Sequence, residues 1–209
     1  MNEKKLVIFD MDGTLVDSSI TISNSINYVR NEFYLPPLTH KDIISKINDH
    51  SVNPAQYFYK SQTFTKEHER LFSQYYSANH KSELMLYDGV IDLLIELKNG
   101  GFKLGVATNA YRVSALESLS HLGIVEFFDA IVCYDDVKSG KPSPDMLHEN
   151  IKIAGSVIEQ SIFVGDGERD MMAAQTISMD YIMVDWGFSE HKNAIKDISE
   201  LKNILLSSI

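Results

Sequence analysis

The chain has 209 residues, 44% of them hydrophobic and 23% charged, which is ordinary for a globular protein of one domain, with or without an insertion. Acidic residues outnumber basic ones by 29 to 19, and the net charge of −10 argues against nucleic acid or a membrane surface as a partner. The single cysteine, Cys133, excludes an intramolecular disulfide framework and a four-cysteine zinc site. The first apolar run, Leu6–Phe9, is too short for a signal peptide or a membrane span, so we expect a cytoplasmic protein.

Short apolar runs, each closed by a polar residue, recur along the chain and are typical of parallel strands covered on both faces. They are Leu6–Asp10, Phe102–Thr108, Ala130–Cys133, Ser161–Asp166 and Tyr181–Asp185. Segments with helical spacing lie between them, at residues 90–97, 114–122, 143–154 and 168–177. This alternation predicts an α/β fold with a doubly wound parallel sheet.

One long interval interrupts this alternation. About seventy residues between the first strand and the helix near Val90 hold no strand-like run, far more than a simple crossover needs. Periodic apolar positions there predict helices at 20–33, 40–47, 54–59 and 65–78. Residues 16–82 have a net charge of +1 and ten of the 21 aromatic residues, whereas the remainder has a net charge of −11. We therefore predict a helical domain, 16–82, inserted into an α/β domain formed by 1–15 and 83–209.

The first acidic motif, Asp10-Met-Asp12-Gly13-Thr14, directly follows the first strand, at the edge where open α/β sheets bind ligands. Two carboxylates this close repel each other unless a cation or a proton lies between them. Taken alone, the motif is also compatible with an acidic turn that has no function. A calcium loop fits poorly, because its third acidic residue is missing and Thr21 stands where its closing glutamate belongs.

A second acidic pair, Asp166 and Asp170, follows another predicted strand. If a helix begins near Glu168, both side chains face the same edge of the sheet. Helix capping by Asp166 is the alternative, but it does not explain why two strands both end in acidic residues. Together with Asp10 and Asp12, the pair predicts an all-oxygen site that suits Mg²⁺ rather than zinc, and such a site suggests a phosphate substrate.

Two further elements suit a phosphate group. Thr108 and Asn109 end the second predicted strand before a helix, where a hydroxyl and free backbone N–H groups can bind an anion. Lys141 precedes Pro142, which we expect in the first turn of a helix, and a lysine held there can reach a phosphoryl oxygen. The plainer interpretations are a strand-to-helix cap for the first element and a solvated surface lysine for the second.

These motifs, in this order and over nearly the whole chain, resemble those of the haloacid dehalogenase (HAD) superfamily of hydrolases. They read Asp10-x-Asp12-Gly13-Thr14, Thr108-Asn109, Lys141-Pro142-x-Pro144 and Gly165-Asp166-x-x-x-Asp170. The helical insertion and the string 135–144 are similar to the α-helical cap and the third motif of the phosphoglycolate phosphatase-like subfamily. The resemblance implies a Rossmann-like core with an inserted α-helical cap domain.

The resemblance also implies roles for the two acids of the first motif. Asp10 is expected to be the nucleophile that forms an aspartyl-phosphate and to be a Mg²⁺ ligand. Asp12 is expected to be the general acid/base, and its backbone carbonyl is expected to bind Mg²⁺. Dehalogenases of the superfamily lack this second acid, so Asp12 points to phosphoryl chemistry.

The remaining motifs are expected to bind phosphate and metal. The resemblance implies that Thr108, with Asn109 beside it, binds the phosphoryl group, and that Lys141 neutralises its charge and keeps the nucleophile ionised. Asp166 is expected to bind Mg²⁺ with support from Asp170. Gly167 stands where relatives commonly have a small hydroxyl residue, so one hydrogen bond to the water shell of the metal is expected to be missing.

We therefore predict a Mg²⁺-dependent phosphatase that acts on a small phosphorylated metabolite, as a monomer or weak dimer. A sugar-phosphate mutase would use the same motifs and is the alternative. A phospho-receiver fits less well because receivers have no helical insertion, and a binding module fits less well because every catalytic position is filled. The substrate stays open among phosphoglycolate, sugar phosphates, nucleoside monophosphates and pyrophosphate. Specificity is expected from cap residues such as Lys46, Asn48 and His50, although these are equally compatible with a solvated helix.

Overall fold

The computed structural model describes residues 4–47, 52–187 and 193–207. The chain divides into two compact units, residues 1–17 with 86–209 and residues 18–85, and each has its own hydrophobic core. Within the described ranges, none of the helices combines the length and the apolar character that a membrane crossing requires.

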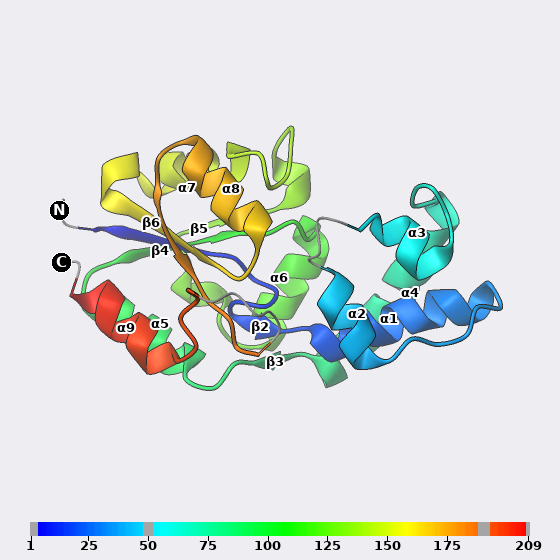
Figure 1. Cartoon of the computed structure of the whole chain (residues 1–209). Helices are drawn as coiled ribbons and strands as arrows, with labels where there is room; N and C mark the ends of the chain where they lie inside the picture. Colours follow the sequence, from blue (N-terminus) through cyan, green and yellow to red (C-terminus); the bar gives the residue numbers. More distant parts are fainter. Residues whose placement is uncertain (1–3, 48–51, 188–192, 208–209) are drawn as a thin grey trace. The chain divides into compact units, whose positions relative to one another are not determined.

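The first unit is built around a sheet of parallel strands in the order β5-β4-β1-β6-β7 (Figure 1). The strands are β1 (Leu6–Phe9), β4 (Lys103–Ala107), β5 (Ala130–Val132), β6 (Ser161–Gly165) and β7 (Asp180–Met183). Every residue of β1 and β6 is buried, which explains why these runs are continuously apolar rather than alternating. The strand predictions are confirmed, except that each strand ends one or two residues before the polar residue that closes its run.

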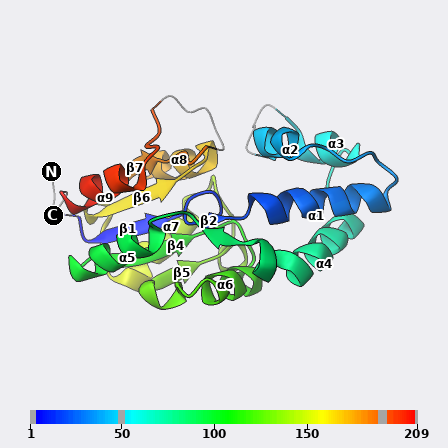
Figure 2. The same cartoon turned by 90° about the horizontal axis from the view of Figure 1, so that it is seen from below.

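Helices cover both faces of this sheet. Figure 1 shows α7 and α8 on one side of the strands and α5 and α9 on the other, and Figure 2 shows the same layers from below. The helices of the unit are α5 (Val90–Asn99), α6 (Arg112–His121), α7 (Asp145–Ala154), α8 (Glu168–Thr176) and α9 (Ile198–Leu206). One core cluster lies between α7, α8 and the strands, and it includes Leu6, Ile8 and Phe163. The predicted doubly wound α/β fold is confirmed.

The start of α7 was predicted wrongly. Pro142 was expected in its first turn, but α7 begins at Asp145, with Pro144 as its N-cap residue. The reason lies in the second proline, because a residue that precedes proline is disfavoured in helical conformation, and this applies to Ser143. Residues 141–144 therefore form a loop at the edge of the sheet rather than a helical turn.

The second unit is helical and consists of α1 (Ser19–Glu32), α2 (His40–Ile47), α3 (Pro54–Tyr59) and α4 (Lys66–Glu83). All these helices were predicted, although α4 runs five residues beyond its expected end at Ala78. Its core, which includes Val29, Phe58 and Leu71, is rich in aromatic residues. Lys46 lies in the last turn of α2, whereas Asn48 and His50 lie outside the described residues.

Two very short strands were missed in the interval expected to hold none. β2 (Val16–Asp17) and β3 (Met85–Leu86) pair as a two-stranded sheet. Strands of two residues are too short to show the alternation by which a strand is recognised in a sequence.

Candidate active site

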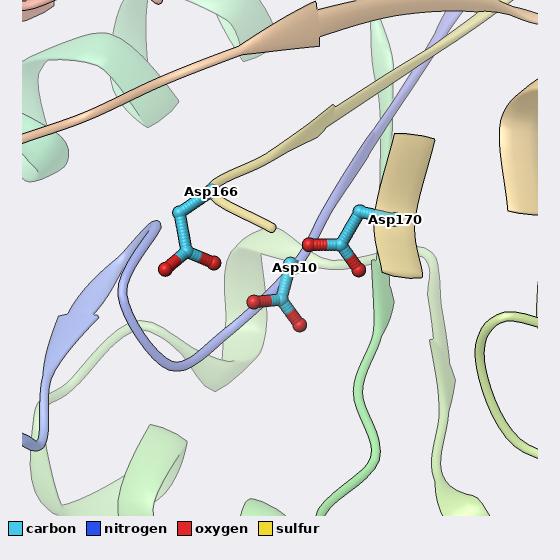
Figure 3. Close-up of side chains that lie close together, drawn as sticks. All are labelled: Asp10, Asp166 and Asp170. Atoms are coloured by element: carbon cyan, nitrogen blue, oxygen red, sulfur yellow. The ribbon is translucent and has the colours of Figure 1, made fainter. Parts of the chain in front are cut away.

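Three carboxylates meet at the carboxyl edge of the sheet (Figure 3). Asp10 follows β1 directly and Asp166 follows β6, and these two strands are paired neighbours. Asp170 lies in the first turn of α8, one helical turn beyond Asp166. One carboxylate oxygen from each of the three residues lies within 4.8 Å of the others. The carboxylates of Asp10, Asp166 and Asp170 thus lie close together, as the sequence led us to expect.

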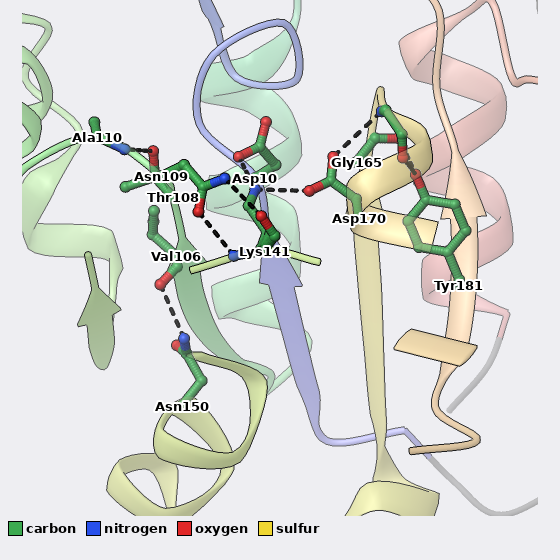
Figure 4. A network of polar contacts seen from close by, with 11 residues as sticks. Asp10, Val106, Thr108, Asn109, Ala110, Lys141, Asn150, Gly165, Asp170 and Tyr181 are labelled. Carbon is green, nitrogen blue, oxygen red and sulfur yellow. Dashed lines mark hydrogen bonds and ion pairs between the residues drawn. The ribbon is translucent and has the colours of Figure 1, made fainter. Parts of the chain in front are cut away.

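Lys141 joins this acidic cluster from the loop before α7. Its ammonium group donates a hydrogen bond to Oδ1 of Asp10 and forms an ion pair of 2.7 Å with Oδ1 of Asp170 (Figure 4). The Lys141 side chain is only 4% exposed. Burial alone lowers the pKa of Lys141, but Asp10 and Asp170 outweigh it and hold that pKa above its usual value. The lysine is therefore a permanently charged group of the site and not a solvated surface residue.

The protein alone does not neutralise the acidic charge. Burial raises the pKa of Asp10 to about 7; Lys141 opposes this shift, while Asp170 and Asp12 add to it. Burial, followed by the charges of Asp10 and Asp170, also raises the pKa of Asp166 well above its usual value. Carboxylates crowded in this way hold protons unless a cation binds among them.

The donor set fits Mg²⁺. Asp10, Asp166 and Asp170 offer hard carboxylate oxygens, and among the described residues no histidine or cysteine joins this group, which suits Mg²⁺ rather than zinc. Gly13, at φ +85°, brings the backbone of the first motif against Asp166, and a Cβ on Gly13 would lie 2.2 Å from Oδ2 of that residue. The turn of the first motif therefore packs closely against the Asp166 carboxylate.

The side chain of Asp12 is not part of this carboxylate group among the described residues. Asp12 lies in the turn after β1, where Asp12 and Val16 form an isolated bridge and Gly13 N–H donates to the Val16 carbonyl at 2.9 Å. A role of Asp12 as a metal ligand would accordingly use its backbone carbonyl, as the resemblance implies, and would leave the carboxylate for proton transfer.

Thr108 and Asn109 lie beside Lys141, and both make hydrogen bonds to the backbone (Figure 4). The side-chain amide of Asn109 donates to the Lys141 carbonyl at 3.1 Å and accepts from the Lys141 N–H at 2.9 Å. Asn109 therefore holds the backbone of the loop 141–144, called the lysine loop below, at Lys141. The hydroxyl oxygen of Thr108, which is buried, accepts from the Ala110 N–H at 3.0 Å.

The helix that follows Thr108 and Asn109 begins two residues before the predicted range 114–122. α6 starts at Arg112, whose N–H donates to Asp135 at 2.8 Å, so an acidic side chain already caps this helix end. One backbone N–H of this helix end is therefore already bonded, and anion binding at Thr108 and Asn109 stays a prediction. Arg112 also forms an ion pair of 2.7 Å with Asp136, which fixes the start of α6 to the loop after β5.

Three residues outside the predicted motifs, Cys133, Trp186 and Tyr181, make packing or backbone contacts. Cys133 is fully buried directly after β5, and burial raises the pKa of its thiol to about 12, which agrees with an inert packing role. Trp186 donates from Nε1 to the Thr14 carbonyl at 2.9 Å, and Tyr181 donates to the Gly165 carbonyl at 2.9 Å. No sequence signal identified the last two, because an aromatic residue at the end of a strand predicts packing rather than a hydrogen bond to one particular carbonyl.

The family model of the haloacid dehalogenase-like hydrolases matches residues 7–184, and the chain belongs to this family. The predicted family and the predicted class of enzyme, a hydrolase, are confirmed. The chain is 32% identical over 192 residues to a phosphoglycolate phosphatase of Agrobacterium fabrum, which covers 88% of this chain and 82% of the relative. It is 28% identical over 201 residues to the pyrophosphatase PpaX of Bacillus pumilus, covering 94% and 91% of the two chains.

A solved structure gives the same assignment. The crystal structure of a predicted phosphatase from Clostridium acetobutylicum superposes with a TM-score of 0.83 at 26% identity and covers 99% of this chain and 100% of that one. The similarity spans both the α/β unit and the helical unit in sequence. The prediction of a HAD-type core that carries a helical insertion therefore agrees with the fold and the family alike.

Proposed function

We propose that this protein is a Mg²⁺-dependent phosphatase that hydrolyses a small phosphate monoester through an aspartyl-phosphate on Asp10. The observation that carries the proposal is the buried contact between Asp10 and Lys141, with Asp166 and Asp170 beside them. A carboxylate beside a fixed ammonium group can act as a nucleophile toward an anionic phosphorus centre, because the ammonium offsets the repulsion between the two anions.

The reaction needs two displacements at phosphorus. In the first, an oxygen of Asp10 attacks phosphorus, the bond from phosphorus to the ester oxygen breaks, and the leaving oxygen takes a proton from Asp12. In the second, Asp12 accepts a proton from water, and that water attacks phosphorus. The bond between phosphorus and Asp10 then breaks, which releases inorganic phosphate and regenerates the carboxylate.

The other residues hold the phosphoryl group. We assign Thr108 and Lys141 to its oxygens, while Asn109 keeps the lysine loop in place through its two backbone hydrogen bonds. Mg²⁺ would be held by Asp10, Asp166 and the Asp12 carbonyl, with Asp170 in support, and would neutralise phosphoryl charge in the transition state. The ion pair between Lys141 and Asp170 gives Asp170 a second task, which is to orient the ammonium group.

The relatives support a small phosphorylated substrate. They are named for phosphoglycolate and for pyrophosphate, which differ in the leaving group but share a terminal phosphoryl group. We therefore propose a small phosphorylated metabolite as the substrate. The role of the helical unit as a cap that selects the leaving group remains a prediction.

Release of inorganic phosphate tests the proposal. We expect turnover of at least one member of a panel comprising phosphoglycolate, sugar phosphates, nucleoside monophosphates and pyrophosphate. EDTA should abolish that turnover and Mg²⁺ should restore it. Full activity in the chelator would refute the metal assignment. Conversion of a sugar monophosphate into its isomer without phosphate release would instead identify the mutase.

A further inference from the structure

The turn that carries Asp166 is flanked by two glycines, Gly165 and Gly167. At Gly165 a Cβ would lie 2.6 Å from Oδ2 of Asp170, so the close approach of that carboxylate requires glycine. At Gly167 the nearest atom is 3.5 Å from the Cβ position and φ is −124°, so neither sterics nor backbone conformation requires glycine there. The turn therefore carries more conformational freedom than its close packing demands.

The two ends of this turn are anchored to different elements. The Gly165 carbonyl accepts from the Val184 N–H at 2.9 Å, just beyond β7, whereas the Gly167 carbonyl accepts from the Asp170 N–H at 3.1 Å, within α8. The position of Asp166 therefore depends on how the strand end and the helix start are held relative to each other.

The hydroxyl of Tyr181 spans these two ends. It donates to the Gly165 carbonyl at 2.9 Å and lies 3.3 Å from the Gly167 carbonyl (Figure 4). Tyr181 belongs to β7, where it is paired in register with Phe163 of β6, and the two rings are 5.8 Å apart. The phenol is thus held by the sheet and reaches one carbonyl on each side of Asp166.

We propose that Tyr181 is a positioning residue that fixes the Gly165–Gly167 turn and thereby orients Asp166 for Mg²⁺ binding. The inference rests on the proposed function, because it needs a metal at Asp166. Partners outside the ligand shell commonly set metal affinity in this way, by restricting the orientation of a ligand. In this role Tyr181 acts through the turn and is not itself a ligand of the metal.

The test is a titration of Mg²⁺ into the purified full chain without substrate, followed by calorimetry. We expect Tyr181→Phe to weaken Mg²⁺ binding by about three- to tenfold, the size of one lost hydrogen bond. At saturating Mg²⁺ its kcat should stay within about twofold of the wild type, because the reacting groups are unchanged. Tyr75→Phe is the matched control, because it removes a hydroxyl that hydrogen-bonds Glu83 in the helical unit, and its Mg²⁺ affinity should equal that of the wild type.

A second variant separates ordering of the turn from ordinary destabilisation. Gly167→Ala restricts the backbone of the turn and has room for its methyl group, so it should restore most of the lost affinity when added to Tyr181→Phe. Thermal unfolding without metal should show that all the variants are folded.

Each other outcome has a definite meaning. The inference is overturned if Tyr181→Phe binds Mg²⁺ as tightly as the wild type, or if Tyr75→Phe loses as much affinity. It is also overturned if Gly167→Ala restores no affinity. The phosphatase proposal stays intact in all three cases. A wild-type protein that binds no Mg²⁺ overturns both.

Discussion

The Nζ atom of Lys141 lies 2.7 Å from Oδ1 of Asp170, and the same ammonium group donates to Asp10. The two carboxylates come from different elements, one from the end of β1 and the other from the first turn of α8. A single positive charge thus connects the residue proposed to attack phosphorus with the helix that carries part of the proposed metal site. Because these side chains are at most 9% exposed, loss of the ammonium would leave buried charge without compensation.

Lys141→Met should therefore reduce both stability and activity. We expect a loss of about 3–5 kcal/mol in the free energy of unfolding, which is typical when one partner of a buried ion pair is removed. Urea denaturation without Mg²⁺ measures it, and phosphate release should fall by at least about a thousandfold because the phosphoryl charge is no longer offset. Lys152→Met, which removes an exposed pair with Glu149, should change the unfolding free energy by less than about 1 kcal/mol. Equal effects of the two variants would contradict a special role for Lys141.

The stability of the metal-free protein should depend on pH in an unusual direction. Burial raises the pKa of Asp10 to about 7 and that of Asp166 well above its usual value, so folding favours the protonated forms. These two groups stabilise the fold fully only below their unfolded pKa values near 4, and their contribution is lost as pH rises through the folded pKa values.

Mg²⁺ should reverse this trend, because it binds the deprotonated carboxylates. The increase in Tm on adding Mg²⁺ should therefore be small at pH 5 and should grow up to about pH 8. Scanning calorimetry with Mg²⁺ and with EDTA at each pH measures the difference. A Mg²⁺ effect that is constant over this pH range would show that these two carboxylates do not carry the linkage.

Gly165→Ala should disrupt the site from a neighbouring backbone position. The added Cβ would lie 2.6–2.8 Å from Cβ, Cγ and Oδ2 of Asp170, so that side chain must move and its ion pair with Lys141 must break. We expect the unfolding free energy to fall by about 1–3 kcal/mol, as for overpacking in a core, and phosphate release to fall by at least about a hundredfold. Gly167→Ala, with 3.5 Å to the nearest atom, should leave the unfolding free energy within about 0.5 kcal/mol. Similar stability of the two variants would contradict this steric argument.

The sequence predicted the placement of the acidic residues because it depends on strand ends alone. Asp10 and Asp166 each follow a continuous apolar run, and parallel strands bring such ends to one edge of a sheet. The helical insertion was visible for a similar reason, since its apolar spacing and near-neutral charge differ from those of the α/β segments. These features are local in sequence, so no knowledge of long-range contacts was needed.

The contacts between the motifs were not predictable in this way. Two examples are the hydrogen bonds of Asn109 to the backbone of Lys141 and the hydrogen bond from Tyr181 to the Gly165 carbonyl. Both depend on loop conformations and on side-chain rotamers. The start of α7, two residues later than predicted, has a local cause, because Pro144 disfavours helical conformation at Ser143. The start of α6 at Arg112 involves a contact with Asp135, which is distant in the sequence.

Asp10→Asn should abolish turnover and preserve the fold. The amide keeps the shape of the side chain but has no nucleophilic carboxylate oxygen. We expect phosphate release below about a thousandth of the wild-type rate, with a circular dichroism spectrum like that of the wild type. Asp17→Asn is the matched control, since Asp17 lies in β2 and outside the carboxylate cluster, and it should retain phosphate release. Substantial activity in Asp10→Asn would reduce Asp10 to a metal ligand.

The last prediction separates the two proton transfers assigned to Asp12. An alkyl phosphate needs a proton on its leaving oxygen, whereas an aryl phosphate has an acidic leaving group and does not. Both substrates need a base for the water that cleaves the aspartyl-phosphate. Removal of the Asp12 carboxylate should therefore block the first step for alkyl phosphates but only the second step for aryl phosphates.

With Asp12→Ala, an aryl phosphate should give a burst of phenol equal to the amount of enzyme, followed by a slow steady state. Rapid-mixing absorbance measures the burst, and mass spectrometry of the quenched protein should show one added phosphoryl group, which Asp10→Asn in the same background should eliminate. An alkyl phosphate should give almost no burst with the same variant, because its leaving oxygen receives no proton. If Asp12→Ala slows both substrates equally and no phosphorylated protein accumulates, the carboxylate of Asp12 does not transfer the protons. The two-step scheme would then rest on the contact between Asp10 and Lys141 alone.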